Sequence, residues 1–355
     1  MIKISIIVPI YNVQDYIGRC FDSIICQECN DYALECIIVN DCSPDDSIRI
    51  VKMRLDDYNG KIDFKIINHQ KNEGLSAARN TGIRSSSGDF VFFVDSDDRL
   101  ESDALKTLVD SLNSEDKNSQ VDVVMGNSFL CKNGKQAMIF ETREPVLYEN
   151  NDETALKNLL NRNIFHTAWN KLIRLDFLLK YNIYFEKGII DEDLLWSYFV
   201  FLHARSVLVV PSVTYIYEDN PGSIMNTASS RVAKVIKSRI VICNKILECP
   251  PKCSFVEFYV YLFYILSRAI DLYELNKGDS LVSEFSIDID YLSDTLLYEA
   301  KRKKLYLLYL FFLTSKRTYY NVYRCRLYRM YYDKIAKLMV IIQKKQSQLV
   351  FRTSD

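Results

Sequence analysis

Short apolar runs alternate with amphipathic helical stretches through the first 125 residues of the chain. The runs are too short for helices and are rich in β-branched and aromatic residues, which is typical of buried strands. Apolar strands separated by helices predict an α/β fold with a mostly parallel sheet flanked by helices. We expect strands at Ile4–Pro9, Leu34–Asn40, Phe64–Asn68, Phe90–Val94 and Val121–Gly126. We expect helices at Gln14–Ile25, Asp45–Tyr58, Ser76–Arg84 and Ser102–Leu112.

The pattern changes after residue 126. Polar, hairpin-like stretches are followed by expected helices at Asp152–Arg162 and Asn170–Tyr181, and by a strand at Val207–Val210. From about residue 229 the chain is expected to be almost wholly helical. We therefore predict an α/β domain over residues 1–226, with halves at 1–125 and 126–226, and an α-helical C-terminal extension over 227–355.

The expected strand Phe90–Val94 ends in the sequence Asp95-Ser96-Asp97-Asp98. Three carboxylates within four positions repel one another unless a cation lies between them. Oxygen ligands of this kind favour Mg²⁺ or Mn²⁺, which proteins commonly hold with one or two carboxylates and substrate phosphates. The alternative is a solvated acidic loop that precedes the next helix.

Polar or functional groups follow each of the first four expected strands, and the carboxyl ends of parallel strands meet at one edge of a sheet. Tyr11 offers a flat face to a nucleobase, Asp41 offers an acceptor for a base N–H, and Arg79 can reach a diphosphate. Singly, the alternatives are ordinary packing for Tyr11, an Asx turn for Asp41 and a structural role for Arg79. Together on one edge, they favour a nucleotide cleft, although neither G-x-G-x-x-G nor a P-loop motif is present.

Charge and composition narrow the class of partner. The net charge is −1, and no nucleic-acid-binding module is recognised, so we expect no nucleic-acid partner. Ten dispersed cysteines predict a reducing, cytoplasmic setting, and no apolar run is long enough to span a membrane. Residues 301–352 carry fourteen Lys or Arg against one acidic residue. This segment could contact the anionic inner leaflet of the membrane, cap the fold or mediate dimerisation.

These motifs resemble those of family 2 glycosyltransferases with the GT-A (Rossmann-like) fold, of the type that builds bacterial cell-surface polysaccharides. The match is specific over about residues 3–115 and looser to about 226. The segments that carry it are Ser5–Asn12, Val39–Ser43, Asn72–Asn80, Val94–Asp98, Trp169–Leu172, Glu186–Asp193 and Pro221–Met225.

The resemblance implies inverting transfer of a sugar from a nucleotide-diphosphate donor, for which we favour a UDP-sugar, to a glycan or a lipid-linked acceptor. It implies Mn²⁺ or Mg²⁺ as cofactor, held by Asp97 and Asp95. The implied catalytic base lies in the pair Glu192-Asp193, and we favour Asp193. The residues expected to bind the nucleotide-sugar are Pro9, Tyr11, Asn12, Asp41, Asn72, Gly74, Arg79, Asp95 and Ser96.

Physical chemistry supports the same roles. A cation stabilises the charge on a departing diphosphate, and a carboxylate can take the proton of an attacking hydroxyl. The alternative for Glu192-Asp193 is a solvated helix N-terminus, where acidic residues suit the helix dipole.

Two positions depart from the family pattern, Asn40 where a second Asp is frequent and Glu218 where a basic residue is common. A nucleotidyltransferase and an inactive glycosyltransferase-like binding module are the alternative functions.

Overall fold

The computed structural model describes residues 1–27, 30–115, 120–132, 135–138, 144–150, 153–161, 164–218, 229–252, 256–303 and 305. The chain divides into two compact units, which are described separately. The first, here called the α/β unit, contains Met1–Leu159, Asn163–Gly188 and Glu192–Met225. The second, here called the helical unit, contains Leu160–Arg162, Ile189–Asp191 and Asn226–Asp355.

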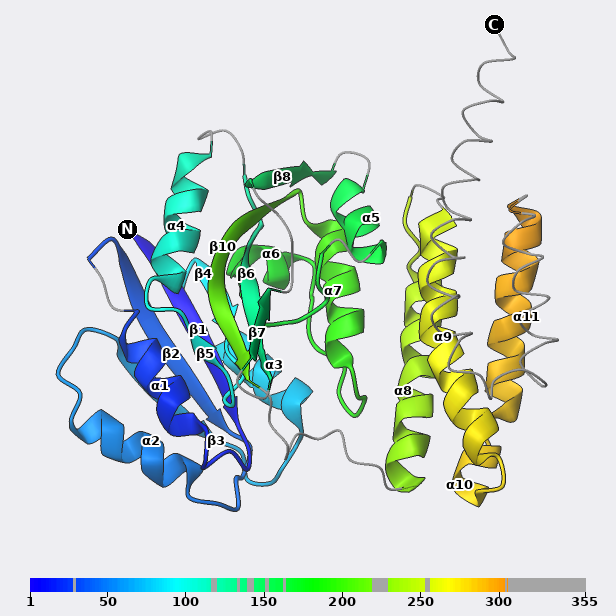
Figure 1. Ribbon diagram of the computed structural model, residues 1–355, viewed down its shortest axis with the longest axis horizontal. Coiled ribbons are helices and arrows are strands. Elements are labelled where there is room, and N and C mark those ends of the chain that lie inside the picture. Colours follow the sequence, from blue (N-terminus) through cyan, green and yellow to red (C-terminus); the bar gives the residue numbers. More distant parts are fainter. Residues whose placement is uncertain are drawn as a thin grey trace, which may run out of the picture. The chain divides into compact units, whose positions relative to one another are not determined.

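The α/β unit begins with the predicted alternation of strands and helices (Figure 1). The strands are β1 (Ile2–Ile10), β2 (Tyr32–Asn40), β3 (Asp63–Asn68) and β4 (Phe90–Phe93). The helices between and after them are α1 (Ile17–Ile25), α2 (Ser47–Asp56), α3 (Leu75–Ser85) and α4 (Ala104–Ser114).

The rest of the α/β unit adds six strands and three helices to the described structure. The strands are β5 (Arg99–Leu100), β6 (Val123–Lys132), β7 (Lys135–Met138), β8 (Val146–Glu149), β9 (Lys171–Arg174) and β10 (Ser206–Glu218). The helices are α5 (Thr154–Leu160, the last residue of which falls in the helical unit), α6 (Leu175–Lys180) and α7 (Glu192–His203).

All ten strands form one sheet, with the order β3-β2-β1-β4-β9-β6-β10-β5; β7 pairs with β6, and β8 pairs with β10. Strands β3, β2, β1 and β4 are parallel, so their carboxyl ends lie on one edge, as predicted. Beyond β4 most pairs are antiparallel, except that β10 runs parallel to β6. The α/β fold class is thus confirmed, while the parallel character belongs mainly to the first half of the sheet.

The predicted helix over Asn170–Tyr181 is wrong for its first part. Residues Lys171–Arg174 form β9, which lies between β4 and β6 and pairs antiparallel with both. Leu172 and Ile173 are completely buried there. Local propensity did not reveal this strand, because burial between two neighbouring strands decides its conformation. The helix begins only at Leu175, as α6.

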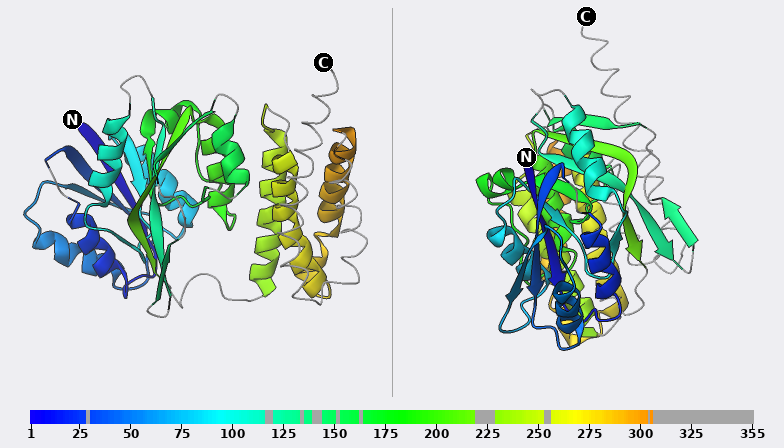
Figure 2. Two further views of the ribbon diagram at one scale, coloured as in Figure 1. Left: turned by 45° about the horizontal axis from the view of Figure 1, so that its top comes forward. Right: turned by 90° about the vertical axis from the view of Figure 1, so that its left-hand side faces the viewer.

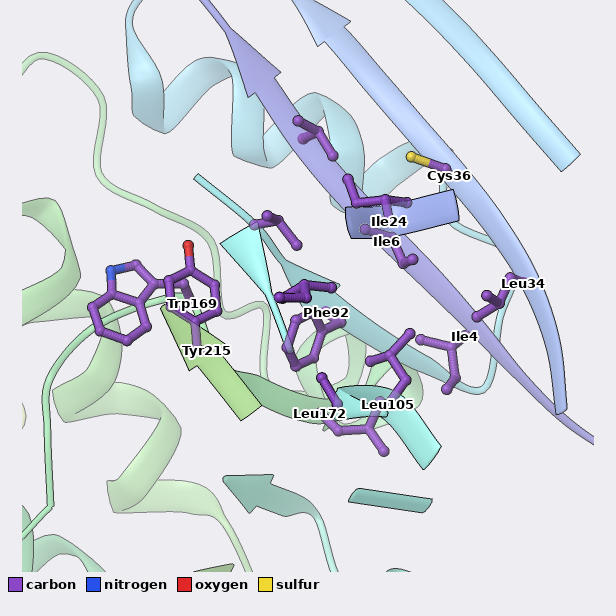
Figure 3. Packing of buried hydrophobic residues seen from close by; sticks show 14 of the residues in the cluster. Ile4, Ile6, Ile24, Leu34, Cys36, Phe92, Leu105, Trp169, Leu172 and Tyr215 are labelled. Atoms are coloured by element: carbon purple, nitrogen blue, oxygen red, sulfur yellow. The ribbon is translucent and has the colours of Figure 1, made fainter. Parts of the chain in front are cut away.

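Two hydrophobic layers cover the sheet. On one face, alternate residues of β1, β2 and β4 pack with α1, α2 and α4 in a large core cluster, which Figure 3 shows around Phe92 and Leu105. On the other face, Ala78 of α3 packs on Ile37 and Val39 of β2. Helix α3 lies so close to β1 that a Cβ atom at Gly82 would stand 2.2 Å from Cγ2 of Ile7.

The described part of the helical unit contains α8 (Ser229–Glu248), α9 (Val256–Asn276), α10 (Ser280–Ser283) and α11 (Ser286–Arg302). Helix α9 packs against both α8 and α11, and the three long helices are seen side by side in Figures 1 and 2. Among the described helices, none is both long and apolar enough to cross a bilayer. Most of the basic segment, from residue 306 onward, lies outside the described residues.

Candidate functional site

The turn after β4 builds the acidic end of the candidate site. Asp98 closes this turn, because its backbone N–H donates to the carbonyl oxygen of Asp95 at 3.0 Å. The carboxylate of Asp98 is 1 % exposed and faces inward. Its Oδ2 accepts the hydroxyl of Tyr215 at 2.8 Å, and its Oδ1 accepts the backbone N–H of Glu218 at 2.9 Å. Burial, reinforced by the neighbouring charge of Asp97, raises the pKa of Asp98 well above its usual range.

Tyr215 connects the acidic turn to the second half of the sheet. Its hydroxyl oxygen also accepts the backbone N–H of Asp95 at 3.1 Å. Its ring stacks on Trp169, with ring centroids 4.4 Å apart, as Figure 3 shows. The third carboxylate of the acidic cluster is therefore a fixed part of the scaffold.

Asp95 and Asp97 are half-buried and supply hard oxygen donors at the open end of β4. Two such carboxylates suit Mg²⁺ or Mn²⁺ when a diphosphate completes the coordination. Among the described residues, no group of three or more His, Cys, Asp or Glu side chains is arranged to hold a metal ion. Asp95 and Asp97 alone would thus supply two carboxylate ligands, and a diphosphate would have to complete the coordination of any cation held there.

Arg79 joins the two acidic clusters. It lies on α3 with its side chain 3 % exposed. One end of its guanidinium donates to Oδ1 of Asp95 at 2.7 Å, and the other donates to Oε1 of Glu192 at 2.7 Å. Burial opposes the charge of Arg79, but the two carboxylates outweigh burial and raise its pKa. The sequence predicts that Arg79 reaches a diphosphate; in the structure it bridges Asp95 and Glu192, the second of which lies 113 positions from it along the chain.

An aromatic cluster of Phe93, Phe185 and Trp196 packs against this bridge. The ring of Phe185 stacks on Trp196 at 4.5 Å between centroids, and Phe93 meets both rings edge-on. The guanidinium of Arg79 lies 5.2 Å above the Phe185 ring. The side-chain amide of Asn80 exchanges two hydrogen bonds of 2.8 Å with the backbone of Phe185. These contacts hold the segment that leads toward Glu192 against α3, and they could not be identified from the sequence.

The pair Glu192-Asp193 forms the first turn of α7, where acidic side chains are favoured by the helix dipole. Glu192 is buried and committed to Arg79, and burial raises its pKa even though the guanidinium opposes the shift. Asp193 is half-buried beside it. The preceding Asp191 belongs to the helical unit, where its carboxylate accepts a 2.5 Å bond from Arg239. Asp193 thus lies in the same helical turn as Glu192, and its charge acts on the pKa of Arg79 and of Glu192.

Lys171 is a second basic residue, and the charge of Asp193 affects its pKa. It is completely buried, and its ammonium donates to the carbonyl of Thr167 at 2.5 Å and to the Thr167 hydroxyl at 3.0 Å. Burial lowers the pKa of Lys171 to about 7, while the charge of Asp193 acts in the opposite direction. In the sequence, Lys171 is recognised only as part of the segment Trp169–Leu172 that resembles the family.

Asn170, the residue before Lys171, has a structural role. Its backbone adopts a left-handed conformation with φ of 59°. Its amide nitrogen lies 2.9 Å from the carbonyl oxygens of Gly126 and Asn127, and its amide oxygen accepts the hydroxyl of Thr214 at 2.6 Å. The side chain of Asn170 thereby connects β6 to β10 through hydrogen bonds.

The loops predicted to bind the nucleotide lie at the ends of β1, β2 and β3. Tyr11 is 46 % exposed, Asn12 has a left-handed φ of 56°, and Asn72 is exposed, whereas Pro9 is buried within β1. Gly74 caps α3 at φ 90°, a conformation that glycine adopts without strain. Ser96 is buried in the acidic turn.

Asp41 follows β2 and lies among backbone donors. It is 2 % exposed, and its carboxylate accepts the N–H groups of Glu73 and Gly74 at 2.8 and 2.7 Å. It thus fixes the loop that opens α3. The described contacts divide the predicted residues into one group formed by Asp95, Arg79 and Glu192 and a second group around Asp41 and Gly74. Helix α3 carries Arg79 of the first group, and Gly74 of the second group is the N-cap of the same helix.

The two departures from the family pattern have structural explanations. The amide of Asn40 donates to Asn68 at 2.8 Å and accepts the backbone N–H of Ser43 at 2.9 Å, so it holds the ends of β2 and β3 together. The carboxylate of Glu218 forms an ion pair with Arg99 at 2.9 Å, and its backbone N–H donates to the carboxylate of Asp98. Neither substitution leaves an unpaired group at the site.

Known proteins match the chain in sequence and in fold. Residues 5–180 match the model of Glycosyl transferase family 2. Glycosyltransferase GlyA of Streptococcus pneumoniae is 33 % identical over 62 % of this chain and 31 % of its own length. The uncharacterized glycosyltransferase EpsJ of Bacillus subtilis is 33 % identical over 62 % of each chain. The chain thus covers less than two thirds of the length of these relatives.

Among solved structures, S. aureus TarS 1-349 in complex with UDP-GlcNAc is similar, with a TM-score of 0.62. It is 22 % identical, and the match covers 89 % of this chain and 92 % of that one, which supports the GT-A fold. The family match spans the strand-end motifs and Arg79, and the fold agrees. The chain therefore belongs, through residues 5–180, to glycosyl transferase family 2.

Proposed function

We propose that this protein transfers a sugar from a nucleotide-diphosphate donor to a hydroxyl group of an acceptor, with inversion at the anomeric carbon. The observation that carries the proposal is the double ion pair of Arg79 with Asp95 and Glu192. It sets the acidic turn, which suits a diphosphate and its cation, beside the acids of α7, which suit proton removal. A simple binding site for a nucleotide would need only the first of these.

The donor would bind to the loops that follow β1, β2 and β3 and to the acidic turn after β4. Tyr11 presents an exposed ring for stacking on a nucleobase, and Asp41 offers its carboxylate to a base N–H. Pro9, Asn12, Asn72, Gly74 and Ser96 would shape the walls of this nucleotide-sugar site. Arg79 is buried between two carboxylates. It would hold Asp95 in position and would not leave these partners to bind the donor itself.

Asp97 and Asp95 would hold Mn²⁺ or Mg²⁺ on the diphosphate. When bound, such a cation neutralises negative charge that develops on the leaving group. Asp98 would keep the turn in place through Tyr215 and Glu218. A fixed turn would limit the movement of Asp95 and Asp97 relative to one another.

Asp193 would be the general base. The acceptor oxygen forms a bond to the anomeric carbon, the bond from that carbon to the diphosphate oxygen breaks, and the acceptor proton passes to the Asp193 carboxylate. Glu192 would remain paired with Arg79 and hold the first turn of α7 in position. The products are a glycosylated acceptor and a nucleoside diphosphate.

The donor we favour is a UDP-sugar, and the acceptor a glycan or a lipid-linked glycan in cell-surface polysaccharide synthesis. The similarity of fold to TarS, which was solved in complex with UDP-GlcNAc, supports a nucleotide-sugar donor. The glycosyltransferases of S. pneumoniae and B. subtilis that resemble this chain support the same class of reaction.

A thermal-shift screen of nucleotide-sugars with Mn²⁺ tests the donor site. A donor present at 100 times its Kd should stabilise the protein by about 2.7 kcal/mol, a shift of roughly 5 °C or more. Asp97→Ala should remove the Mn²⁺-dependent part of this shift and weaken donor binding about tenfold. Asp110→Ala, which alters an exposed acid on α4, is the matched control.

Retention of the full Mn²⁺-dependent shift in Asp97→Ala would contradict the metal assignment. The product identifies the reaction: a glycosyltransferase releases a nucleoside diphosphate, whereas a nucleotidyltransferase acting on a nucleoside triphosphate releases pyrophosphate. Binding of donor without any turnover in the presence of acceptor extracts would instead support an inactive binding module.

We further propose that the protein is cytoplasmic and contacts the inner face of the membrane through residues 301–352. The support is the excess of fourteen basic residues over one acidic residue. Each basic residue near an anionic surface contributes about 1 kcal/mol. The protein should sediment with vesicles of phosphatidylglycerol and phosphatidylcholine, and not with phosphatidylcholine alone. Deletion of residues 306–355 should abolish that sedimentation; unchanged sedimentation of the truncated protein would contradict the proposal.

A further inference from the structure

His69 stands between two elements of the donor site. It directly follows β3, and its backbone N–H donates to the carbonyl of Asn40 at 2.9 Å. Its ring nitrogen Nδ1 lies 2.7 Å from Oδ1 of Asp41, and Nε2 lies 2.9 Å from the hydroxyl oxygen of Thr81 on α3. The ring is largely buried, with 10 % of its side chain exposed.

The carboxylate of Asp41 has few acceptor positions left. Each carboxylate oxygen offers about two lone-pair sites. Oδ1 is occupied twice, by Nδ1–H of His69 and by the N–H of Glu73. Oδ2 is occupied once, by the N–H of Gly74. One acceptor position therefore remains, and it lies on Oδ2.

The tautomer of His69 follows from its partners. A carboxylate can only accept, so the proton between the two groups is on Nδ1 and is donated to Asp41. In the neutral ring Nε2 then accepts the hydroxyl proton of Thr81. His69 thus locks the rotation of the Asp41 carboxylate from one side while the two backbone N–H groups lock it from the other.

We infer that His69 is a positioning residue of the donor site, which orients Asp41 so that its remaining Oδ2 acceptor meets a ring N–H of the nucleobase. This inference rests on the proposed function and deepens it, since it names the chemistry that selects the base. A base whose ring N–H faces Oδ2 is bound, as uracil can offer at N3. A base that presents an acceptor or a methyl group there leaves a buried acceptor unpaired and is rejected.

The amide side chains of Asn and Gln separate this role from general packing. Asn at position 69 can place its NH₂ near the position of Nδ1 and still donate to Asp41. Gln places its NH₂ near the position of Nε2 and loses that donation. His69→Asn and His69→Gln therefore remove the same aromatic ring, yet only the first keeps the hydrogen bond that the inference requires.

The experiment compares UDP with N3-methyl-UDP, each titrated calorimetrically with Mn²⁺ present against the full-length protein and both variants. The wild-type protein should bind UDP about tenfold more tightly than the N3-methyl analogue. His69→Gln should bind UDP about tenfold more weakly and lose most of this preference, while His69→Asn should retain it. In turnover assays His69→Gln should raise the donor KM and leave kcat within about twofold.

An undiminished preference for UDP in His69→Gln, with wild-type melting behaviour, would overturn the inference. An equal loss in both variants would also overturn it, because it would show that the ring packs and does not orient. Absence of any nucleotide binding by the wild-type protein would instead reject the proposed function, and the role of His69 with it.

Discussion

Asp193→Asn is expected to abolish sugar transfer while the donor continues to bind. The carboxylate of Asp193 is half-buried in the first turn of α7, next to a Glu192 that is held by Arg79. Asparagine has nearly the same shape but cannot take a proton from the acceptor. General-base catalysis contributes about 10²- to 10⁴-fold, and kcat should fall by roughly that factor.

The measurement separates chemistry from binding. Donor affinity, followed by calorimetry with Mn²⁺, should change by less than about threefold in Asp193→Asn, because the donor-side residues are untouched. Asp103→Asn is the matched control, since Asp103 is an exposed acid that precedes α4 and lies outside the acidic clusters. A collapse of donor affinity in Asp193→Asn, or retained turnover, would show that the proton goes elsewhere, and Glu192→Gln would then be the next variant to assay.

The first half of the fold was predictable because its rules are local. Apolar runs give the strands, helical periodicity gives α1 with Ile17, Cys20, Phe21 and Ile24 on its buried face, and parallel pairing puts the strand ends on one edge. The candidate residues gather there for that reason. The second half was less predictable, since β9 owes its conformation to being buried between β4 and β6.

The hydrogen bonds and ion pairs within the site could not be predicted from the spacing of its residues in the sequence. The sequence shows three carboxylates after β4, but only the approach of β10 reveals that Asp98 belongs to Tyr215 and Glu218. In the same way, Arg79 is visible as a cation on α3, whereas its pairing with Glu192 depends on a contact across 113 residues. Such contacts are products of the whole packed unit, so a motif can locate a residue without defining its partner.

Arg79→Met is expected to have the largest effect on stability. Methionine fills part of the same volume but leaves the carboxylates of Asp95 and Glu192 without their cation. Removal of one partner from a buried ion pair typically costs about 3–5 kcal/mol. The free energy of unfolding of the α/β unit, measured by urea denaturation, should fall by roughly that amount. Transfer activity should also be lost, because the two acidic clusters are no longer tied together.

A matched series distinguishes this bridge from a general need for a cation on α3. Arg84→Met removes an exposed arginine from the last turn of the same helix and should cost less than about 1 kcal/mol. Arg79→Lys keeps a charge but cannot donate to both carboxylates at once, so its stability should lie between those of the wild-type protein and Arg79→Met.

Adding Glu192→Gln to Arg79→Met should restore part of the lost stability, since a neutral amide costs less free energy to bury than an unpaired carboxylate. It should not restore transfer, because the link to Asp95 is still missing. Equal stability of Arg79→Met and Arg84→Met would contradict the bridge and, with it, the arrangement on which the proposed transfer depends.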